Sequence, residues 1–386
     1  MAKVALALPA DTRDLSWLPE TPRQQAGSTA LTAALNSTLH RERWKYTSSK
    51  LCLEALNAVM QPPRITGLDQ TGVQHLDLAP SALPDALFDP ISAPEAAARL
   101  SYANQISIVE ITAPLQQPLH IYHAANTQPC IILLRTNSEA ELLEIIQPSD
   151  APMQQTLWVY LEANARLVHS RNTEPTESTS GHGAALSSAT DHNWQYLRIL
   201  LDQAARYSLH NHLCGASQRR QDIQICLAAP DSEANLLSAA AIGAKQHLDQ
   251  QVTIEHRAPR TRSQQRLHNV VADGGNVTFN GRIHIHAGAN GSDAQLSNKN
   301  IALGDGATIN TKPELEIYTD DVRCAHGATI GQLAADEIYY LQSRGINAEQ
   351  AQTLLSRGFL LQCMQGPLAE SAQKLLNTLG LAQEST

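Results

Sequence analysis

The sequence predicts a mainly β protein in which a parallel β-helix core lies between an N-terminal and a C-terminal helical region. Short runs such as ISIVEIT, CIILLR and LWVYLEA follow one another from about residue 103, separated by polar turns. Two later segments resemble each other at a spacing of roughly 30 residues. On both sides of this region, apolar residues instead recur at helical spacing.

The internal repeat carries the β-helix prediction. Aligning NVVADGGNVTFNGRIHIHAGA with NIALGDGATINTKPELEIYTD places Asn269 over Asn300, with no helical pattern between the strands. Such coils stack the aliphatic side chains of one turn on those of the next. Because side chains alternate along a strand, RIHIHA directs its isoleucines inward and Arg282, His284 and His286 outward. We interpret those outward histidines as part of a solvated face.

The helical ends have recognisable boundaries. STALTAALNSTLH and TSSKLCLEALNAV have helical spacing, and a Ser/Thr-rich loop is expected at 172–193. Near the C-terminus, AADEIYYLQSR stops at Gly345, and Asn347 with Gln350 forms a capping-box start for the next helix. The predicted organisation is therefore 1–95 as the N-terminal helical region, 96–331 as the β-helix core and 332–386 as the C-terminal helical region.

Composition limits the partners and the compartment. The 386-residue chain has a formal net charge of -9, and Lys and Arg never run beyond a pair. A nucleic-acid surface needs concentrated positive charge, so nucleic acid is not expected as a partner. The sequence offers neither a good signal peptide nor an apolar run of about 18 to 20 residues, so we expect a cytoplasmic protein without membrane contact. Its six cysteines lack C-x-x-C spacing, which favours reduced, structural thiols.

The segment TDDVRCAHGATIG contains the first candidate metal ligands, Cys324 and His326. Residues two apart on a strand share a face, so a soft thiolate and an imidazole would lie side by side, a pair suited to iron or zinc. A closed site needs more ligands, and these would come from another coil or another chain. The alternative is a buried cysteine beside a turn histidine. Asp320 and Asp321 point to opposite faces if extended, which favours a turn role over acid–base chemistry.

A second array lies in YSLHNHLCG, where His210, His212 and Cys214 also alternate along one strand. By spacing alone they form a three-ligand set. Alternate residues of a β-helix face solvent, however, and polar residues there need no function. We therefore favour the solvated-face interpretation, and leave occupancy of the array open. The sequence contains no phosphate-binding Gly-rich loop, G-x-S-x-G, H-E-x-x-H or dinucleotide fingerprint, which favours a scaffold over a stand-alone enzyme.

Several motifs resemble those of the SufB/SufD family, the β-helical components of the SUF iron–sulfur cluster assembly system. The resemblance rests on DQQVTIEHRAP, on VTFNGRIHIHAGANGSDAQLSNKNIAL, on KPELEIYTDDVRCAHGATIGQL and on IYYLQSRGI. RERWKYTS near the N-terminus and Cys-Ala-His-Gly-Ala at 324–328 are similar to the SufD branch. The chain is accordingly identified as a SufD-type member of the family.

The resemblance implies a right-handed β-helix and a non-catalytic role in a SufB–SufC–SufD complex, with the cluster built mainly on SufB. It implies pairing with a SufB-type paralogue through the β-helix end, where Cys324 and His326 would meet ligands from the partner. Iron or an iron–sulfur cluster is expected only at that shared interface, with no cofactor stably bound to the chain alone. Because an uncovered β-helix end leaves strand edges unpaired, we expect a homodimer when the chain is alone.

The resemblance also implies contact between the C-terminal helices and a SufC-type ABC ATPase, which would supply ATP hydrolysis. Tyr339, Tyr340 and Arg344 are residue types suited to anchor such a contact. We expect at least one of the tyrosines to pack onto the β-helix instead. The alternative function is that of a β-helical polysaccharide lyase or hydrolase, which would need a carboxylate cluster on the outer wall.

Overall fold

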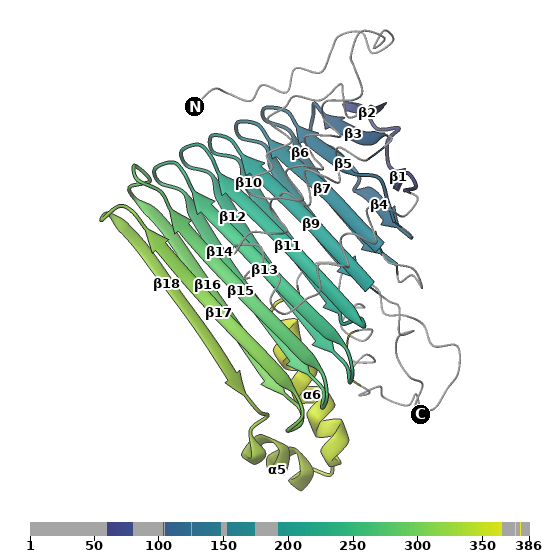
Figure 1. The fold of residues 1–386 in the computed structure, drawn as a ribbon, viewed down its shortest axis with the longest axis vertical. Helices are drawn as coiled ribbons and strands as arrows, with labels where there is room; N and C mark the ends of the chain where they lie inside the picture. Colours follow the sequence, from purple (N-terminus) through teal and green to yellow (C-terminus); the bar gives the residue numbers. More distant parts are fainter. Residues whose placement is uncertain are drawn as a thin grey trace, which may run out of the picture.

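The computed structural model describes residues 60–79, 103, 105–124, 126–147, 153–173, 192–364, 375 and 379. Two nine-stranded sheets face each other along an elongated solenoid (Figure 1). We call them sheet A and sheet B. Sheet A consists, in spatial order, of β1 (Arg64–Thr66), β4 (Leu119–His123), β6 (Glu139–Ile146), β8 (Arg166–Thr173), β10 (Arg206–Cys214), β12 (Glu233–Ile242), β14 (Arg262–Val271), β16 (Ser292–Ala302) and β18 (Val322–Gly331). Sheet B consists of β2 (Val73–Leu78), β3 (Ile106–Ile111), β5 (Cys130–Leu134), β7 (Met153–Leu161), β9 (His192–Leu201), β11 (Gln218–Leu227), β13 (His247–His256), β15 (Asn276–Ile285) and β17 (Thr308–Ile317).

Each coil of the solenoid contributes one strand to each sheet. Neighbouring strands are parallel and in register, except at the first coil, where β1 pairs antiparallel with β4 and β2 antiparallel with β3. Leu197, Ile223 and Val252 show the stacking: they lie side by side on β9, β11 and β13 and are all buried. Burying an aliphatic side chain of this size stabilises the fold by about 1.5–3 kcal/mol. The parallel β-helix core predicted from the repeat is confirmed.

Local sequence explains the tight coil geometry at two kinds of position. Asn137 and Asn164 occupy equivalent turns with φ of 62° and 59°, a backbone region that asparagine tolerates. Their side chains bond across coils, with Asn164 Nδ2 donating to Asn137 Oδ1 at 3.0 Å. Gly281 faces the interior, where a Cβ atom would lie 2.5 Å from the Phe279 ring. The glycine therefore makes room for the only large aromatic side chain of β15.

Two described helices follow the last coil. α5 (Ala335–Ser343) leads to α6 (Ala348–Leu361), which packs against β12 and β14. The predicted capping box is present, because Asn347 and Gln350 each accept a hydrogen bond from the other's backbone N–H. Phe359 anchors α6: its ring stacks on His268 at 4.3 Å between centroids, and its carbonyl oxygen lies 2.8 Å from His268 Nδ1.

The N-terminal boundary differs from the prediction. Within the region expected to be helical, residues 64–66 and 73–78 are the strands β1 and β2. Polar and apolar residues alternate from His75 to Leu78, and the pairing of this strand with β3 extends the first coil of the solenoid. The two predicted helices nearer the N-terminus and nearly all of the 172–193 loop lie outside the described residues. Among the described helices, none is long and apolar enough to span a membrane.

Candidate functional site at the last coil

The last coil of the solenoid has an uncovered end. β18 and β17 are the terminal strands of sheets A and B, and no other described strand pairs with their outer edges (Figure 1). The inward-facing positions are uncovered as well. Ile330 is 54% exposed and Ile317 is 41% exposed, whereas Ile285, the register partner of Ile317 one coil earlier, is fully buried. This end therefore offers two free backbone edges and an apolar layer to a partner.

Cys324 and His326 belong to this end layer. In register, Cys324 lies beside Ala294 and His326 beside Leu296, and both neighbours are buried inward-facing residues of β16. The two candidate ligands thus share the inner face of β18, in agreement with their spacing. Cys324 is half-buried against the core and His326 is exposed. The imidazole is consequently available to a group that approaches the end of the solenoid.

Cys324 and His326 offer one sulfur and one nitrogen as potential ligand atoms. Burial, and then the charge of Asp293, raise the pKa of the Cys324 thiol, so the free chain holds it protonated. A metal ion displaces that proton when a thiol binds it. No third ligand atom from the described residues joins the pair into a cluster. Asp320 and Asp321 lie in the bend before β18, where Gly291 N donates to Asp321 O at 2.6 Å, which agrees with the predicted turn role.

The His210, His212 and Cys214 array does not converge. Their ligand atoms do not lie within 4.8 Å of one another, because residues four apart on a strand are separated by about 13 Å. The favoured solvated-face interpretation is also wrong. His212 and Cys214 are buried, Cys214 in the apolar cluster beneath α6 with Leu360 and Cys363. No disulfide joins any two of the five described cysteines.

Two buried histidines make the stability of the fold sensitive to acid. Burial, reinforced by the neighbouring His210, lowers the pKa of His212 to about 4, and burial with His286 lowers that of His256 to about 4. The unfolded chain binds these protons below about pH 6.5, and the folded chain only near pH 4. The free energy of unfolding should therefore fall as pH decreases from 6.5 to 4, by about 3 kcal/mol per histidine.

Denaturant titrations across this pH range measure the effect. Glutamine at position 212 cannot take up a proton. In His212→Gln the slope of the unfolding free energy against pH should therefore decrease by the contribution of close to one proton. An unchanged slope in His212→Gln would show that His212 does not stay neutral in the fold.

The residues proposed for ATPase contact lie on α5 and at its C-cap. Tyr339 and Tyr340 are 73% and 57% exposed, and Arg344 is exposed, with its guanidinium carbon 5.3 Å from the centre of the Tyr340 ring. The expectation that at least one tyrosine packs onto the β-helix is wrong. α5 contains no buried residue, and it is α6 that packs on β12 and β14. The exposed tyrosines give α5 an apolar surface open to a partner.

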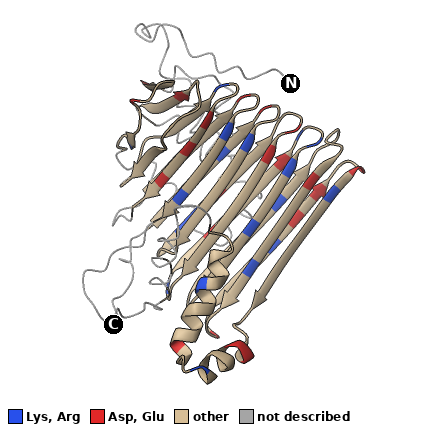
Figure 2. Cartoon of the chain, turned by 180° about the vertical axis from the view of Figure 1, so that it is seen from behind, with Lys and Arg blue, Asp and Glu red and all other residues tan. Residues whose placement is uncertain are grey.

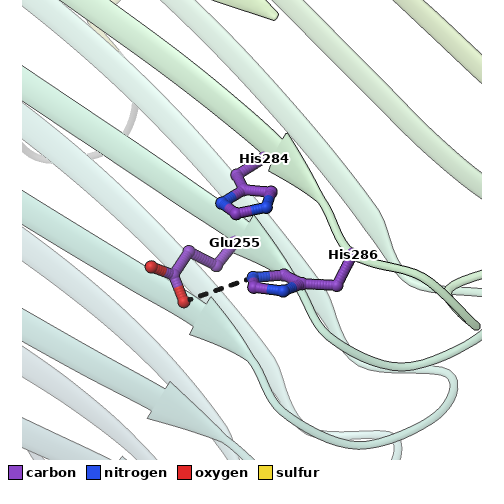
Figure 3. Close-up of side chains that lie close together, drawn as sticks. All are labelled: Glu255, His284 and His286. Atoms are coloured by element: carbon purple, nitrogen blue, oxygen red, sulfur yellow. Dashed lines mark ion pairs between the residues drawn. The ribbon is translucent and has the colours of Figure 1, made fainter. Parts of the chain in front are cut away.

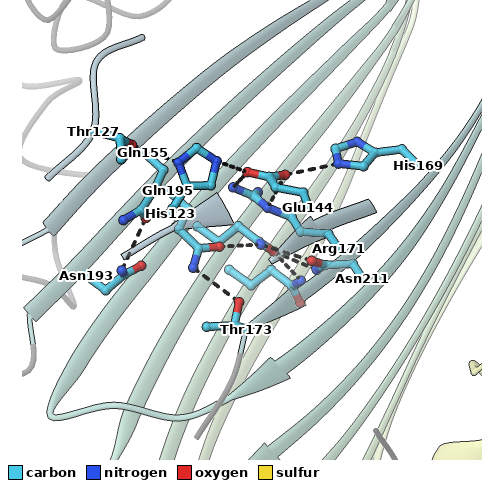
Figure 4. A network of polar contacts seen from close by, with 12 residues as sticks. His123, Thr127, Glu144, Gln155, His169, Arg171, Thr173, Asn193, Gln195 and Asn211 are labelled. Carbon is cyan, nitrogen blue, oxygen red and sulfur yellow. Dashed lines mark hydrogen bonds and ion pairs between the residues drawn. The ribbon is translucent and has the colours of Figure 1, made fainter. Parts of the chain in front are cut away.

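A buried ionic network in the early coils was not predicted from the sequence (Figure 4). Glu144 on β6 lies at its centre, with His123 Nε2 at 3.1 Å, His169 Nε2 at 3.0 Å and Arg171 Nε at 2.9 Å from its carboxylate oxygens. Burial acts to raise the pKa of Glu144, but Arg171 and the two histidines outweigh it and hold that pKa well below the usual range. Burial lowers the pKa of His169, although Glu144 opposes this. Glu144 is therefore a carboxylate.

Buried polar side chains continue beyond this network into the middle coils. Amide groups bond from coil to coil, as in Gln221 Nε2 to Gln195 Oε1 at 2.9 Å and Gln250 Nε2 to Gln221 Oε1 at 3.0 Å. Asn211 Nδ2 donates both to Gln221 Oε1 at 2.8 Å and to Ser238 Oγ at 3.2 Å, so it links the two sheets. The interior thus consists of an aliphatic layer and a polar layer side by side.

The outer wall carries charges of both signs. Lys and Arg are interspersed with Asp and Glu along the strands (Figure 2). Many pairs join neighbouring coils, as for Arg282 with Glu316 at 2.6 Å and Arg260 with Asp231 at 2.7 Å. A groove of about 480 Å³ is lined by Arg206, Asp231, Glu233, Arg260, Arg262 and Gly291. The hydrogen bond from Arg260 lowers the pKa of Asp231, so this carboxyl is no proton donor for glycoside cleavage.

Fold and site together define a parallel β-solenoid whose last coil is uncovered and presents a cysteine and a histidine. The model of the family described as SUF system FeS cluster assembly, SufBD core domain, matches residues 120–359. The chain belongs to this family, as the sequence motifs predicted, and its membership disfavours the polysaccharide-cleaving alternative.

Three relatives illustrate the similarity. The iron-sulfur cluster assembly protein SufD of Escherichia coli (strain K12) is 32% identical over 51% of this chain and 47% of its own length. The SufBD family protein slr0076 of Synechocystis sp. is 29% identical over 68% of this chain and 59% of its own. SufB of Bacillus subtilis (strain 168) is 31% identical over 32% of this chain and 27% of its own. The chain thus spans about half the length of the first two relatives.

Proposed function

We propose that this chain is a SufD-like scaffold subunit that pairs, through its uncovered last coil, with a SufB-type paralogue. The observation that carries the proposal is the end layer itself, which has two free strand edges and carries Cys324 and His326 on one of them, β18. A second solenoid placed end to end would continue both sheets and cover the exposed isoleucines. The similarity to SufD and to SufB supports a partner of the same fold.

In this proposal the chain assists assembly, and iron entry, while the cluster is built mainly on the partner. Cys324 supplies a soft thiolate ligand and His326 a borderline imidazole ligand, and the facing chain supplies the other ligands. The chain itself performs no catalytic step. ATP hydrolysis comes from a SufC-type ABC ATPase that binds the exposed surface of α5.

Co-expression with untagged partners tests this function. A tagged chain should co-elute with both the SufB-type paralogue and the ATPase in a complex of defined mass. An isolated chain should form a homodimer through the same end layer. Recovery of the tagged chain without either partner, under conditions where both are soluble, would contradict the proposal.

Reversing the charge of Arg344 should weaken the ATPase contact. Arg344 is exposed beside Tyr340, and interface anchors of these residue types contribute about 2 kcal/mol or more, which corresponds to roughly a 30-fold loss of affinity. Arg344→Glu should therefore lower the co-purified ATPase while the thermal unfolding midpoint stays unchanged. Arg357→Glu, an exposed arginine on α6, is the matched control. Unchanged ATPase recovery in Arg344→Glu would remove α5 from the contact.

A further inference from the structure

Three potential metal ligands meet on the outer wall of sheet B, one coil before the uncovered end (Figure 3). Glu255 is on β13, His284 is on β15, and His286 follows directly after β15. One ligand atom from each lies within 4.8 Å of the other two, and no other described His, Cys, Asp or Glu residues form such a group. The cluster is separate from Cys324 and His326, which are on the inner face of sheet A.

The coil geometry explains the convergence. Glu255 and His284 are register partners on adjacent parallel strands, so their side chains leave the same wall at neighbouring positions. His286 lies two residues beyond His284 and therefore points to the same side. The two imidazole rings are stacked, with centroids 3.8 Å apart and planes inclined by 14°. Ring nitrogen atoms of both histidines lie near the carboxylate of Glu255 (Figure 3).

Hydrogen bonding leaves a ligand position open. Nε2 of His286 is buried and makes no hydrogen bond to the described residues, and Glu255 Oε2 is 3.7 Å away. In a tetrahedral site with metal–ligand distances of about 2.1 Å, ligand atoms are separated by about 3.4 Å. Because the His284 and His286 rings are stacked nearly parallel, at least one imidazole must turn about its side-chain torsions before its in-plane lone pair and the other ligand atoms can meet at one ion.

Charged neighbours limit the affinity. Arg257 pairs with Glu255 Oε2 at 2.5 Å, and Arg282 pairs with Glu316, whose Oε2 lies 3.7 Å from His284 Nδ1. Without a bound ion, the positive charges of the two arginines balance the negative charges of the two glutamates. Arg282 Nη2 lies 3.3 Å from His284 Nδ1, so Nδ1 accepts from the guanidinium in this structure. A metal at Nε2 requires the proton to move to Nδ1, with the Glu316 carboxylate, 3.7 Å away, as the nearby acceptor.

We propose that Glu255, His284 and His286 form a binding site for a divalent transition-metal ion of the Zn²⁺ or Fe²⁺ class, with water in the remaining positions. Two imidazoles and one carboxylate are a donor set that both ions accept. The site links β13 to β15, so an ion bound there joins consecutive coils. It belongs to this chain alone and does not depend on the proposed pairing with a paralogue.

Zn²⁺ titration of the isolated, chelator-treated chain tests the proposal by calorimetry. The wild type should bind one ion per chain at these residues, and His286→Ala and Glu255→Gln should each weaken that event at least about tenfold. Co²⁺ absorption gives a second readout, because its spectrum reports nitrogen and oxygen ligands without sulfur. His120→Ala, a histidine on sheet A at the opposite end of the solenoid, is the matched control and should bind as the wild type does.

The variants separate this site from the one at the last coil. His326→Ala and Cys324→Ser should retain Zn²⁺ binding at Glu255, His284 and His286 in the isolated chain. The proposal would be overturned if those variants lost Zn²⁺ binding while the double variant His284→Ala/His286→Ala kept it. A wild type that binds no ion, or a double variant that binds with wild-type affinity, would also overturn it. Circular dichroism establishes that each variant is folded before titration.

Discussion

Glu144→Gln should lower the free energy of unfolding by about 3–5 kcal/mol. The substitution keeps the side-chain volume but removes the negative charge that Arg171, His123 and His169 surround, all of them buried. Arg171 then remains as a buried cation without its carboxylate. One of the two carboxylate oxygens becomes an amide NH2 group, so one of the two histidine nitrogens also loses its acceptor. Denaturant-induced unfolding followed by circular dichroism measures the loss as a shift in the midpoint.

Two further variants identify the cause of that loss. Glu162→Gln removes a partly exposed carboxylate that pairs with Arg135 at 2.7 Å, and it should cost only about 0–1 kcal/mol. Arg171→Met combined with Glu144→Gln removes both charges and should recover much of the stability lost in the single variant. A cost below about 1 kcal/mol for Glu144→Gln would mean that the network does not hold the early coils together.

Ile330→Asp should abolish self-association of the isolated chain. Ile330 is 54% exposed in the end layer, so the charge has little effect on the fold of the single chain. In a dimer joined through this layer, however, the carboxylate would be buried without a partner, at a cost of several kcal/mol. We expect the wild type to be dimeric at micromolar concentration and Ile330→Asp to be monomeric, as measured by light scattering after size-exclusion chromatography.

Val168→Asp is the matched control for this experiment. Val168 is also an exposed aliphatic residue, but it lies on β8, in the middle of the solenoid wall. Its substitution should leave the dimer intact. A monomeric wild type, or a dimer that survives Ile330→Asp, would exclude the end layer as the surface of self-association.

The fold was predictable because the evidence for it is local. Alternation within runs such as RIHIHA and the repeat of about 30 residues follow directly from strand geometry and coil stacking. The capping box of α6 depends only on Asn347 and Gln350, three residues apart. The strands β1 and β2 were missed because their short alternating segments stand among helix-like sequence. Only pairing with β4 and β3 settles their conformation.

The candidate sites were predictable only in part. Cys324 and His326 share a face because they are two apart on one strand, and so their side-by-side position followed from spacing. The Glu144 network needs the register of strands about 25 residues apart, and none of its members stands out within its own segment. Glu255 and His284 are 29 positions apart in the chain but adjacent across β13 and β15. Extending the repeat alignment back to QQVTIEHRAP would have brought them together.

Burial was the least predictable property. His212 lies at an outward position of β10, which for an isolated β-helix means solvent, yet it is fully buried. The tyrosines of α5 show the opposite error, since two aromatic residues in a helix beside the solenoid were expected to bury at least one ring. Which face an appended helix covers depends on contacts such as that of Phe359 with His268, far apart in sequence.

Iron and acid-labile sulfide in the purified, co-expressed complex test most directly whether the last coil contributes to a shared metal site. His326→Ala removes the exposed imidazole that we propose as a ligand, and its loss should lower metal affinity at least about tenfold while heterodimer formation persists. The iron and sulfide content of that complex should fall well below that of the wild type. Cys324→Ser should lower the iron and sulfide content less. His75→Ala, at the opposite end of the solenoid, should leave it unchanged. Equal iron and sulfide in His326→Ala and wild type, or loss of the partner itself, would contradict a ligand role for His326.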